Sequence, residues 1–216
     1  MTDLARRGVC LVLCAPSGGG KGAITEGLLA REPTLRRSVS VTTRLPRPGE
    51  IHGVHYHFIT HDDFSAAEQN GELLEWARVL RGTHGYGTPR APVEAALAAG
   101  EDMIFDIDWQ GFRQLRDRLP NDVIGVFILP PGLDVLEQRL RARGGETDAE
   151  IDRRMRTARE EISHWREFDY AIVNDRLDQA IDEVVCILRA ARLATARRSG
   201  LERLVSGMTP DAASEQ

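Results

Sequence analysis

The sequence predicts an α/β protein in which helices cover both faces of a parallel sheet. Short, continuous apolar runs alternate along the chain with segments whose apolar residues have helical spacing. Continuous apolar runs of this length are typical of parallel strands, which are buried on both faces. A glycine-rich loop directly follows the first run. The expected strands cover 8–14, 102–107, 123–129 and 170–173, and the expected helices cover 22–32, 92–99, 110–119, 133–142 and 177–196.

Two segments interrupt this alternation. The first, which is rich in Thr, Gly, Pro, His and aromatic residues, predicts a small mixed lobe inserted into the sheet protein. The second is crowded with charge and has a break at Gly144-Gly145, which predicts a mobile, solvated flap whose helix begins near Thr147 or Asp148. The last residues are small and polar, which predicts a frayed tail. We therefore expect one domain with a core (8–37, 90–135 and 160–200), a lobe (38–89), a lid (136–159) and a disordered tail (206–216).

Composition limits the partners and the location. The 216 residues include 28 basic and 33 acidic side chains, so the net charge of −5 offers no general surface for nucleic acid, and we expect no nucleic-acid partner. No stretch approaches the roughly 20 apolar residues that cross a bilayer, and the first residues lack a signal-peptide core, so we expect a cytoplasmic protein with no membrane partner. A monomer and a homodimer both remain open. Cys10, Cys14 and Cys186 lack the spacing of metal ligands and are interpreted as small buried residues.

The glycine loop, residues 15–22, predicts a phosphate-binding site. A loop between a buried strand and a helix directs successive backbone N–H groups at one point, where the helix adds its positive end. In the pattern G-x-x-x-x-G-K-[ST], Gly20 and Lys21 match, whereas Ala15 replaces the first glycine and Gly22 replaces the hydroxyl residue. Lys21 is the only lysine among 28 basic residues, which indicates a position that needs a compact ammonium group. Because that hydroxyl ordinarily ligates Mg²⁺, we expect weakened binding of metal and nucleotide.

Further motifs follow in a characteristic order. They read SVTTRLPRPGE at 40–50, HYHF at 55–58, LEW at 74–76, YGT at 86–88 and DIDWQG at 106–111. Together with the glycine loop, this order and spacing resembles the guanylate kinase family over about residues 9–192. The resemblance implies a P-loop NTPase core with an inserted GMP-binding lobe and a lid. It also implies ATP-dependent phosphorylation of GMP to GDP in purine nucleotide metabolism, with Mg²⁺ accompanying ATP.

The loop after residue 40 has the residue types that bind a phosphate. Arg44 and Arg47 are three residues apart between prolines, and two guanidinium groups can hold one phosphate dianion. Tyr56 and Tyr86 can add hydroxyl donors. The resemblance assigns all four residues to the phosphate of GMP, and it also implies a catalytic role for Arg44.

A separate residue is needed to recognise the base. Guanine presents N1–H and a 2-amino group as adjacent donors, which one carboxylate can accept, whereas adenine does not. Glu75 matches the guanine-reading carboxylate of the family, with Ser40 and Thr88 as hydroxyl partners. The spacing between Glu75 and Tyr86 is slightly longer than the common form of the family, which predicts an enlarged turn at 81–84.

Two aspartates lie at the end of a predicted strand. Asp106 and Asp108 are two residues apart, so strand alternation predicts that both face the crevice at the carboxyl edge of the sheet. The resemblance places them between the donor and the acceptor, in contact with GMP and organising Mg²⁺ through water.

The resemblance also assigns residues to catalysis and to ATP. Phosphoryl transfer depends on alignment and charge neutralisation, which arginines on a closing lid can supply. Arg139, Arg143 and Arg154 match the lid arginines of the family, whereas Arg141, Arg153, Arg156 and Arg159 are interpreted as solvated. The implied ATP site comprises Ala15, Pro16, Ser17, Gly18, Gly19, Gly20, Lys21, Gly22 and, at the adenine, Asn174.

Two other functions are compatible with parts of the pattern. A binding module that grips a phosphorylated partner without catalysis would agree with the altered Gly22, but it has no use for Lys21 or the lid arginines. A related kinase acting on a sugar phosphate would have no need of a guanine-reading carboxylate at Glu75.

Overall fold

Five parallel strands form the main sheet of the computed structural model, which describes residues 4–79, 83–142 and 144–208. Each neighbouring pair in this sheet is parallel, and β1 occupies the centre with all five of its residues buried. This arrangement confirms the prediction of an α/β protein built on a parallel sheet. The order across the sheet is β2 (Arg36–Arg37), β7 (Met103–Phe105), β1 (Cys10–Cys14), β8 (Val123–Leu129) and β9 (Tyr170–Val173).

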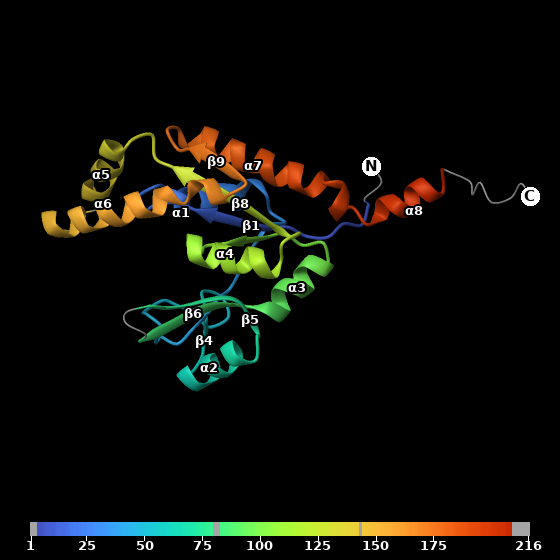
Figure 1. Ribbon diagram of the computed structural model, residues 1–216, viewed down its shortest axis with the longest axis horizontal. Coiled ribbons are helices and arrows are strands. Elements are labelled where there is room, and N and C mark those ends of the chain that lie inside the picture. Colours follow the sequence, from blue (N-terminus) through green and yellow to red (C-terminus); the bar gives the residue numbers. More distant parts are fainter. Residues whose placement is uncertain (1–3, 80–82, 143, 209–216) are drawn as a thin grey trace, which may run out of the picture.

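Helices cover both faces of the main sheet (Figure 1). On one face, α1 (Lys21–Arg31) and α7 (Leu177–Leu193) pack over an apolar cluster that includes Leu11, Ile24 and Val184. On the other face, α3 (Arg90–Ala98) and α4 (Trp109–Arg118) pack over a second cluster that includes Phe105, Phe112 and Leu115. The two apolar clusters therefore lie on opposite faces of the same sheet, which buries both faces of its strands, as is typical of parallel sheets.

The lobe forms a second sheet, which lies apart from the main sheet in Figure 1. The chain leaves the main sheet after β2 and returns to it at β7. Thr60 caps the lobe helix α2 (His61–Gln69) by accepting from Asp63 N, and Phe64 of this helix is fully buried against the sheet. The order across the lobe sheet is β4 (His57–Phe58), β3 (Val41–Thr42), β6 (His84–Pro89) and β5 (Leu73–Val79). Of the enlarged turn predicted at 81–84, residues 81 and 82 lie outside the described residues.

The segment named the lid contains two helices, α5 (Leu133–Ala142) and α6 (Asp148–Ser163). A capping box formed by Thr147 and Glu150 begins α6, as the sequence predicts. Most of the charged side chains of the segment are solvent-exposed, but the two helices also bury a small apolar cluster between them, which the composition does not indicate. Its members are Leu136, Leu140, Ile151, Met155 and Ala158.

The end of the chain departs from the sequence predictions. The last long helix, α7, ends at Leu193 and is followed by a single turn η2 (Thr195–Arg197) and by α8 (Gly200–Ser206). Ser206, where we expected the tail to begin, is therefore helical, and residues 209–216 lie outside the described residues. Cys186 on α7 is exposed, so its interpretation as a buried residue is wrong, whereas Cys10 and Cys14 are buried. None of the helices in the described ranges combines the length and apolarity that a membrane span requires.

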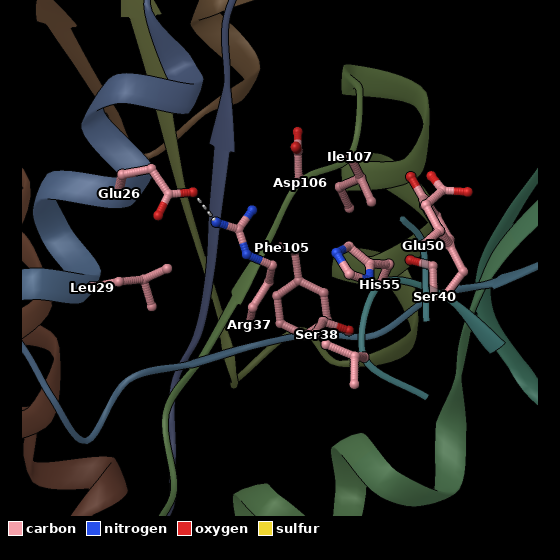
Figure 2. A pocket seen from close by; sticks show the side chains of 12 residues that line it. Glu26, Leu29, Arg37, Ser38, Ser40, Glu50, His55, Phe105, Asp106 and Ile107 are labelled. Atoms are coloured by element: carbon pink, nitrogen blue, oxygen red, sulfur yellow. Dashed lines mark hydrogen bonds and ion pairs between the residues drawn. The ribbon is translucent and has the colours of Figure 1, made fainter. Parts of the chain in front are cut away.

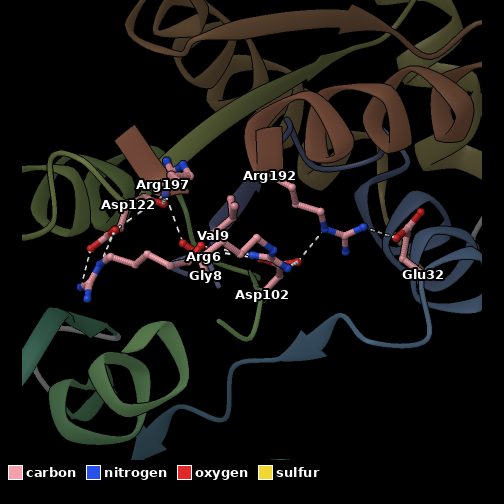
Figure 3. Close-up of polar contacts among 9 residues, drawn as sticks. Arg6, Gly8, Val9, Glu32, Asp102, Asp122, Arg192 and Arg197 are labelled. Atoms are coloured by element: carbon pink, nitrogen blue, oxygen red, sulfur yellow. Dashed lines mark hydrogen bonds and ion pairs between the residues drawn. The ribbon is translucent and has the colours of Figure 1, made fainter. Parts of the chain in front are cut away.

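Ion pairs join the segment before β1 and the end of α7 to the amino edge of the main sheet (Figure 3). Arg6 Nη1 and Arg192 Nε donate to the two oxygens of the buried Asp102, each at 2.7 Å. Arg7 Nε donates to Asp122 at 2.7 Å. Because a buried carboxylate left without partners is costly, these contacts fix the entry of the chain at the edge opposite the glycine loop.

Candidate active site

The backbone of the glycine loop is shaped by two glycines. Gly18 and Gly20 have φ angles of 89° and 96°, in the left-handed region that favours glycine. A Cβ on Gly20 would lie 2.2 Å from Asn174 Nδ2. The loop therefore approaches Asn174 too closely for any side chain at this position.

Some amides of the glycine loop are engaged within the protein and others are free. Gly19 N donates to Pro16 O at 2.8 Å, and Ser17 N donates to Glu161 Oε2 at 3.2 Å. Within the described part of the chain, four of the five amides from Gly18 to Gly22 donate to no protein acceptor. Unsatisfied N–H groups before and within the first turn of a helix are a ready anion site. The free amides are those of Gly18, Gly20, Lys21 and Gly22.

Lys21 and Asp106 form an ion pair that joins the glycine loop to the end of β7. Strand β7 ends at Phe105, so strand alternation does not set the directions of the two aspartates, and this part of the sequence argument is wrong. Asp108 instead caps α4, where its Oδ1 accepts from Gly111 N at 2.8 Å. The two carboxylates therefore have different partners.

Arg44 contacts two tyrosines and a glutamate in the lobe. Its Nε donates to Tyr86 Oη at 3.1 Å, and its guanidinium lies 5.0 Å from the centre of the Tyr56 ring. Its Nη1 and Nη2 donate to the two oxygens of Glu50 at 2.6 and 2.7 Å. Arg44 lowers the pKa of Glu50 to about 2, and Glu50 in turn raises the pKa of Arg44. The structure thus brings together three of the predicted phosphate-binding residues.

Glu50 was not predicted as a site residue, although it lies within the motif. One of its oxygens also accepts from Arg47 N at 2.7 Å, which closes the turn that carries Arg47. The side chain of Arg47 is exposed. The short distance along the sequence between Arg47 and Glu50 is the signal that could have indicated this contact.

Glu75 is buried at the contact between the lobe and α4. Its Oε1 accepts from Thr88 Oγ1 at 2.6 Å, and only 5% of the residue is exposed. Burial raises the pKa of Glu75 to about 7, against the lowering effect of the Thr88 hydroxyl, and the charge of Asp108 raises it further. A Cβ on Gly111 would lie 3.0 Å from Glu75 Oε2, so the start of α4 approaches this carboxylate closely.

A cavity of about 570 Å³ lies between the core and the lobe (Figure 2). Ser40 and Tyr56 line it from the lobe side, and Asp106 lines it from the end of β7. Arg37 also lines this cavity and donates to Glu26 Oε1 at 2.6 Å (Figure 2). The sequence did not indicate Arg37 or Glu26 because neither belongs to a motif.

A second cavity, of about 390 Å³, adjoins the glycine loop at Gly18 and Gly20. The buried Asn174 lines it and donates from Nδ2 to Gly19 O at 2.9 Å. Arg139 also lines it and donates to Asn174 O at 3.0 Å. The loop, the end of β9 and α5 therefore meet around this cavity.

The remaining predicted lid arginines have different positions. Arg154 Nη1 donates to Ser17 Oγ at 3.2 Å, and its Nη2 pairs with Glu146 at 2.6 Å. Arg143 lies outside the described residues. The structure therefore brings Arg154 to one end of the glycine loop, while Arg139 reaches Asn174.

The side chains at this site are compatible with a metal ion whose ligands come mainly from a bound nucleotide. In the described ranges, no group of three or more His, Cys, Asp or Glu side chains could hold a metal on its own. Mg²⁺ commonly binds through one or two carboxylates together with substrate phosphates and waters. Asp106 and Asp108 follow β7 next to the cavity, and Gly22 supplies no hydroxyl.

Comparison with known proteins agrees with this geometry. The family model described as guanylate kinase matches residues 7–191. The chain is 58% identical to the guanylate kinase of Gluconobacter oxydans (strain 621H) over 209 residues, which cover 97% of this chain and all of that protein. It is 53% identical to the guanylate kinase of Granulibacter bethesdensis over 208 residues, or 96% of each chain. The crystal structure of guanylate kinase from Anaplasma phagocytophilum superposes with a TM-score of 0.75 at 34% identity, covering 96% of this chain and 98% of that one. On the family model and these relatives, the chain belongs to the guanylate kinase family.

Proposed function

We propose that this protein transfers the terminal phosphoryl group of ATP to GMP, forming ADP and GDP. The observation that carries the proposal is the Lys21–Asp106 ion pair, which links the free amides of the glycine loop to the cavity beneath the lobe. A donor phosphate on the loop and an acceptor in that cavity would then meet at one place. Membership of the guanylate kinase family supports this reaction. The comparisons give no support to the binding module or to the sugar-phosphate kinase.

The donor nucleotide binds at the glycine loop. The free amides and the Lys21 ammonium neutralise the charge of its phosphates. The cavity beside Asn174 receives the adenine, since it opens next to Gly18 and Gly20. Ala15, Pro16, Ser17 and Gly19 shape the loop, within which Gly19 N is bonded to Pro16 O.

The acceptor nucleotide binds on the lobe side. Arg44 and Arg47 hold the GMP phosphate, with the hydroxyls of Tyr56 and Tyr86 beside Arg44. Glu75, which the Thr88 hydroxyl orients, accepts the N1–H and 2-amino donors of guanine. Ser40 lines the cavity between the core and the lobe. Binding guanine gives the buried carboxylate two donors in addition to the Thr88 hydroxyl.

Transfer needs alignment rather than a base. The attacking oxygen of GMP belongs to a phosphate that is largely ionised near neutral pH, so no side chain must remove a proton. Lys21, Arg44 and the lid arginines Arg139, Arg143 and Arg154 neutralise the charge that develops on the transferring oxygens. Closure of the lid excludes the water that would hydrolyse ATP.

Mg²⁺ accompanies ATP in this proposal. Asp106 and Asp108 would hold it through water, and the nucleotide phosphates would provide the remaining ligands. When bound, the ion neutralises charge between the donor phosphates. A monomer and a homodimer are both compatible with this proposal. We also propose that the reaction takes place in the cytoplasm, as the sequence predicts.

A coupled assay for ADP tests the proposed function. Purified protein is given Mg²⁺ and ATP with GMP, AMP or ribose 5-phosphate as acceptor. We expect equal amounts of ADP and GDP with GMP, and far slower turnover with the other two. Binding of GMP without formation of GDP would instead identify a binding module, and turnover of ribose 5-phosphate would identify a sugar-phosphate kinase.

A further inference from the structure

Helix α6 contacts the glycine loop through two side chains at one residue. Glu161 Oε2 accepts from the backbone N–H of Ser17 at 3.2 Å, and Arg154 Nη1 donates to the Ser17 hydroxyl at 3.2 Å. Arg154 and Glu161 are seven residues apart, which is close to two helical turns, so they share one face of α6. Helix α6 therefore forms hydrogen bonds with both the backbone amide and the side-chain hydroxyl of Ser17.

The neighbouring residue of the loop packs against the other lid helix. A Cβ on Gly18 would lie 3.0 Å from Leu136 Cδ1 and 3.2 Å from Leu140 Cδ2. Leu136 and Leu140 of α5 belong to the apolar cluster that α5 shares with α6. The polar contacts at Ser17 and the apolar contact at Gly18 thus attach one packed unit, made of both lid helices, to the beginning of the glycine loop.

The Ser17 contact also distinguishes the amide of Ser17, which has an acceptor in the protein, from the free amides of the loop. The Ser17 amide already has an anionic acceptor, whereas the amides of Gly18, Gly20, Lys21 and Gly22 donate to no acceptor in the described part of the chain. A hydrogen bond from an amide to a carboxylate is charge-assisted and stronger than one between neutral groups. Glu161 is half-buried, so water competes only partly for this carboxylate.

We infer that Glu161 is a positioning residue, which fastens α6 to the Ser17 amide and so aligns the glycine loop with the lid arginines for phosphoryl transfer. This inference rests on the proposed function. Glu161 acts through the Ser17 amide, whereas Arg154 donates to the hydroxyl of the same residue. The bond holds α6 beside the start of the glycine loop, and so it sets where Arg154 lies relative to the free amides when phosphoryl transfer requires their alignment.

Steady-state kinetics of Glu161 variants test the inference. Glu161→Ala removes the acceptor of the Ser17 amide, and we expect kcat to fall about tenfold or more while KM for ATP and for GMP stays within about twofold. Glu161→Gln keeps an oxygen that can accept the same N–H, so we expect it to retain kcat within about threefold of the parent protein. Glu160→Ala is the matched control, because Glu160 is the adjacent and exposed residue of the same helix. An unchanged kcat in Glu161→Ala, or an equal loss in Glu160→Ala, would overturn the inference.

Hydrogen exchange of the Ser17 amide provides a readout that does not depend on turnover. In the nucleotide-free protein we expect faster exchange in Glu161→Ala than in the parent protein, and unchanged exchange in Glu160→Ala. If the parent protein forms no GDP, the proposed function fails, while the exchange rate still tests the contact. Unchanged exchange of Ser17 in Glu161→Ala would overturn the inference even in an active enzyme.

Discussion

Both carboxylate oxygens of Glu50 accept hydrogen bonds from the guanidinium of Arg44, at 2.6 and 2.7 Å. The same carboxylate closes the turn at Arg47 through the backbone N–H of that residue. One acidic residue therefore orders both arginines proposed to bind the acceptor phosphate. Glu50 is negatively charged and therefore also repels an incoming phosphate. Its net effect on GMP binding depends on whether the ordering of the two arginines outweighs this repulsion.

Replacement of Glu50 measures that balance. In Glu50→Ala, Arg44 and the turn at Arg47 must be ordered when GMP binds, so we expect KM for GMP to rise about tenfold with a smaller change in kcat. Glu50→Gln keeps an acceptor for one bond and should have an intermediate KM. Initial rates at varied GMP and saturating ATP check this. A lower KM in Glu50→Ala would mean that repulsion of the phosphate outweighs the ordering of Arg44.

Replacement of Lys21 tests the donor site. Lys21→Met should lower kcat by roughly three orders of magnitude, because the ammonium group neutralises the phosphates during transfer. The ion pair with Asp106 is partly exposed, so we expect little change in the melting temperature. Lys21→Arg keeps the charge but not the compact shape, and it should also be strongly impaired. Turnover near that of the parent protein in Lys21→Met would contradict the catalytic assignment.

Replacement of Gly22 tests the missing hydroxyl. A Cβ at Gly22 meets no atom within 4 Å, so a serine can be accommodated without moving its neighbours. In Gly22→Ser we expect the Mg²⁺ concentration for half-maximal rate to fall several-fold, because the hydroxyl supplies a ligand that water otherwise provides. Gly22→Ala is the control for helix propensity alone. An equal response to Mg²⁺ in both variants would show that the metal is held without this position.

The raised pKa of Glu75 predicts a pH dependence of GMP binding. Free protein has a Glu75 pKa of about 7, so near pH 6 most molecules carry the protonated carboxyl, which cannot accept both guanine donors. Binding of guanine favours the ionised form and lowers this pKa. The affinity for GMP should therefore rise about tenfold from pH 6 to pH 8. In Glu75→Gln the part of the pH dependence that comes from Glu75 should disappear. Any pH dependence of GMP affinity that remains then reports ionisation of the GMP phosphate, which has a pKa near 6.

The same shift predicts a change in stability of the nucleotide-free protein. The folded-state pKa of Glu75 lies above the ordinary value, so the ionised form is disfavoured in the folded protein. Its contribution to the free energy of unfolding is complete below pH 4 and is lost as the pH rises toward 7. Thermal unfolding of Glu75→Gln should lose this part of the pH dependence, and an unchanged profile would contradict the shift.

Local patterns predict the glycine loop, the strand before it and the start of α6. In each case the residues that determine the structure are adjacent in sequence: Gly18 and Gly20 require the left-handed region, and Thr147 and Glu150 form a capping box within one turn. The motifs also predict that Arg44, Tyr56 and Tyr86 act together. Arg44 follows β3, Tyr56 precedes β4 and Tyr86 lies on β6, and these three strands pair in one small sheet.

Contacts between distant segments explain what the sequence does not predict. Glu161 reaches Ser17 only because α6 packs beside the loop, and nothing near Glu161 in the sequence indicates that contact. Strand alternation failed for Asp108 because the N-cap of α4 begins there, where the backbone must turn into a helix. Cys186 is exposed because it lies on the outer side of α7, which a list of residue types does not specify.

The single lysine gives the donor site an unusual chemical signature. Apart from a chain-terminal amine, Lys21 carries the only primary amine of the sequence, and about a quarter of its side chain is open to solvent. A reagent selective for amines would therefore label this protein at the proposed catalytic lysine and at no other side chain. The extent of labelling, with or without ATP, would count occupied donor sites directly, without any measurement of turnover.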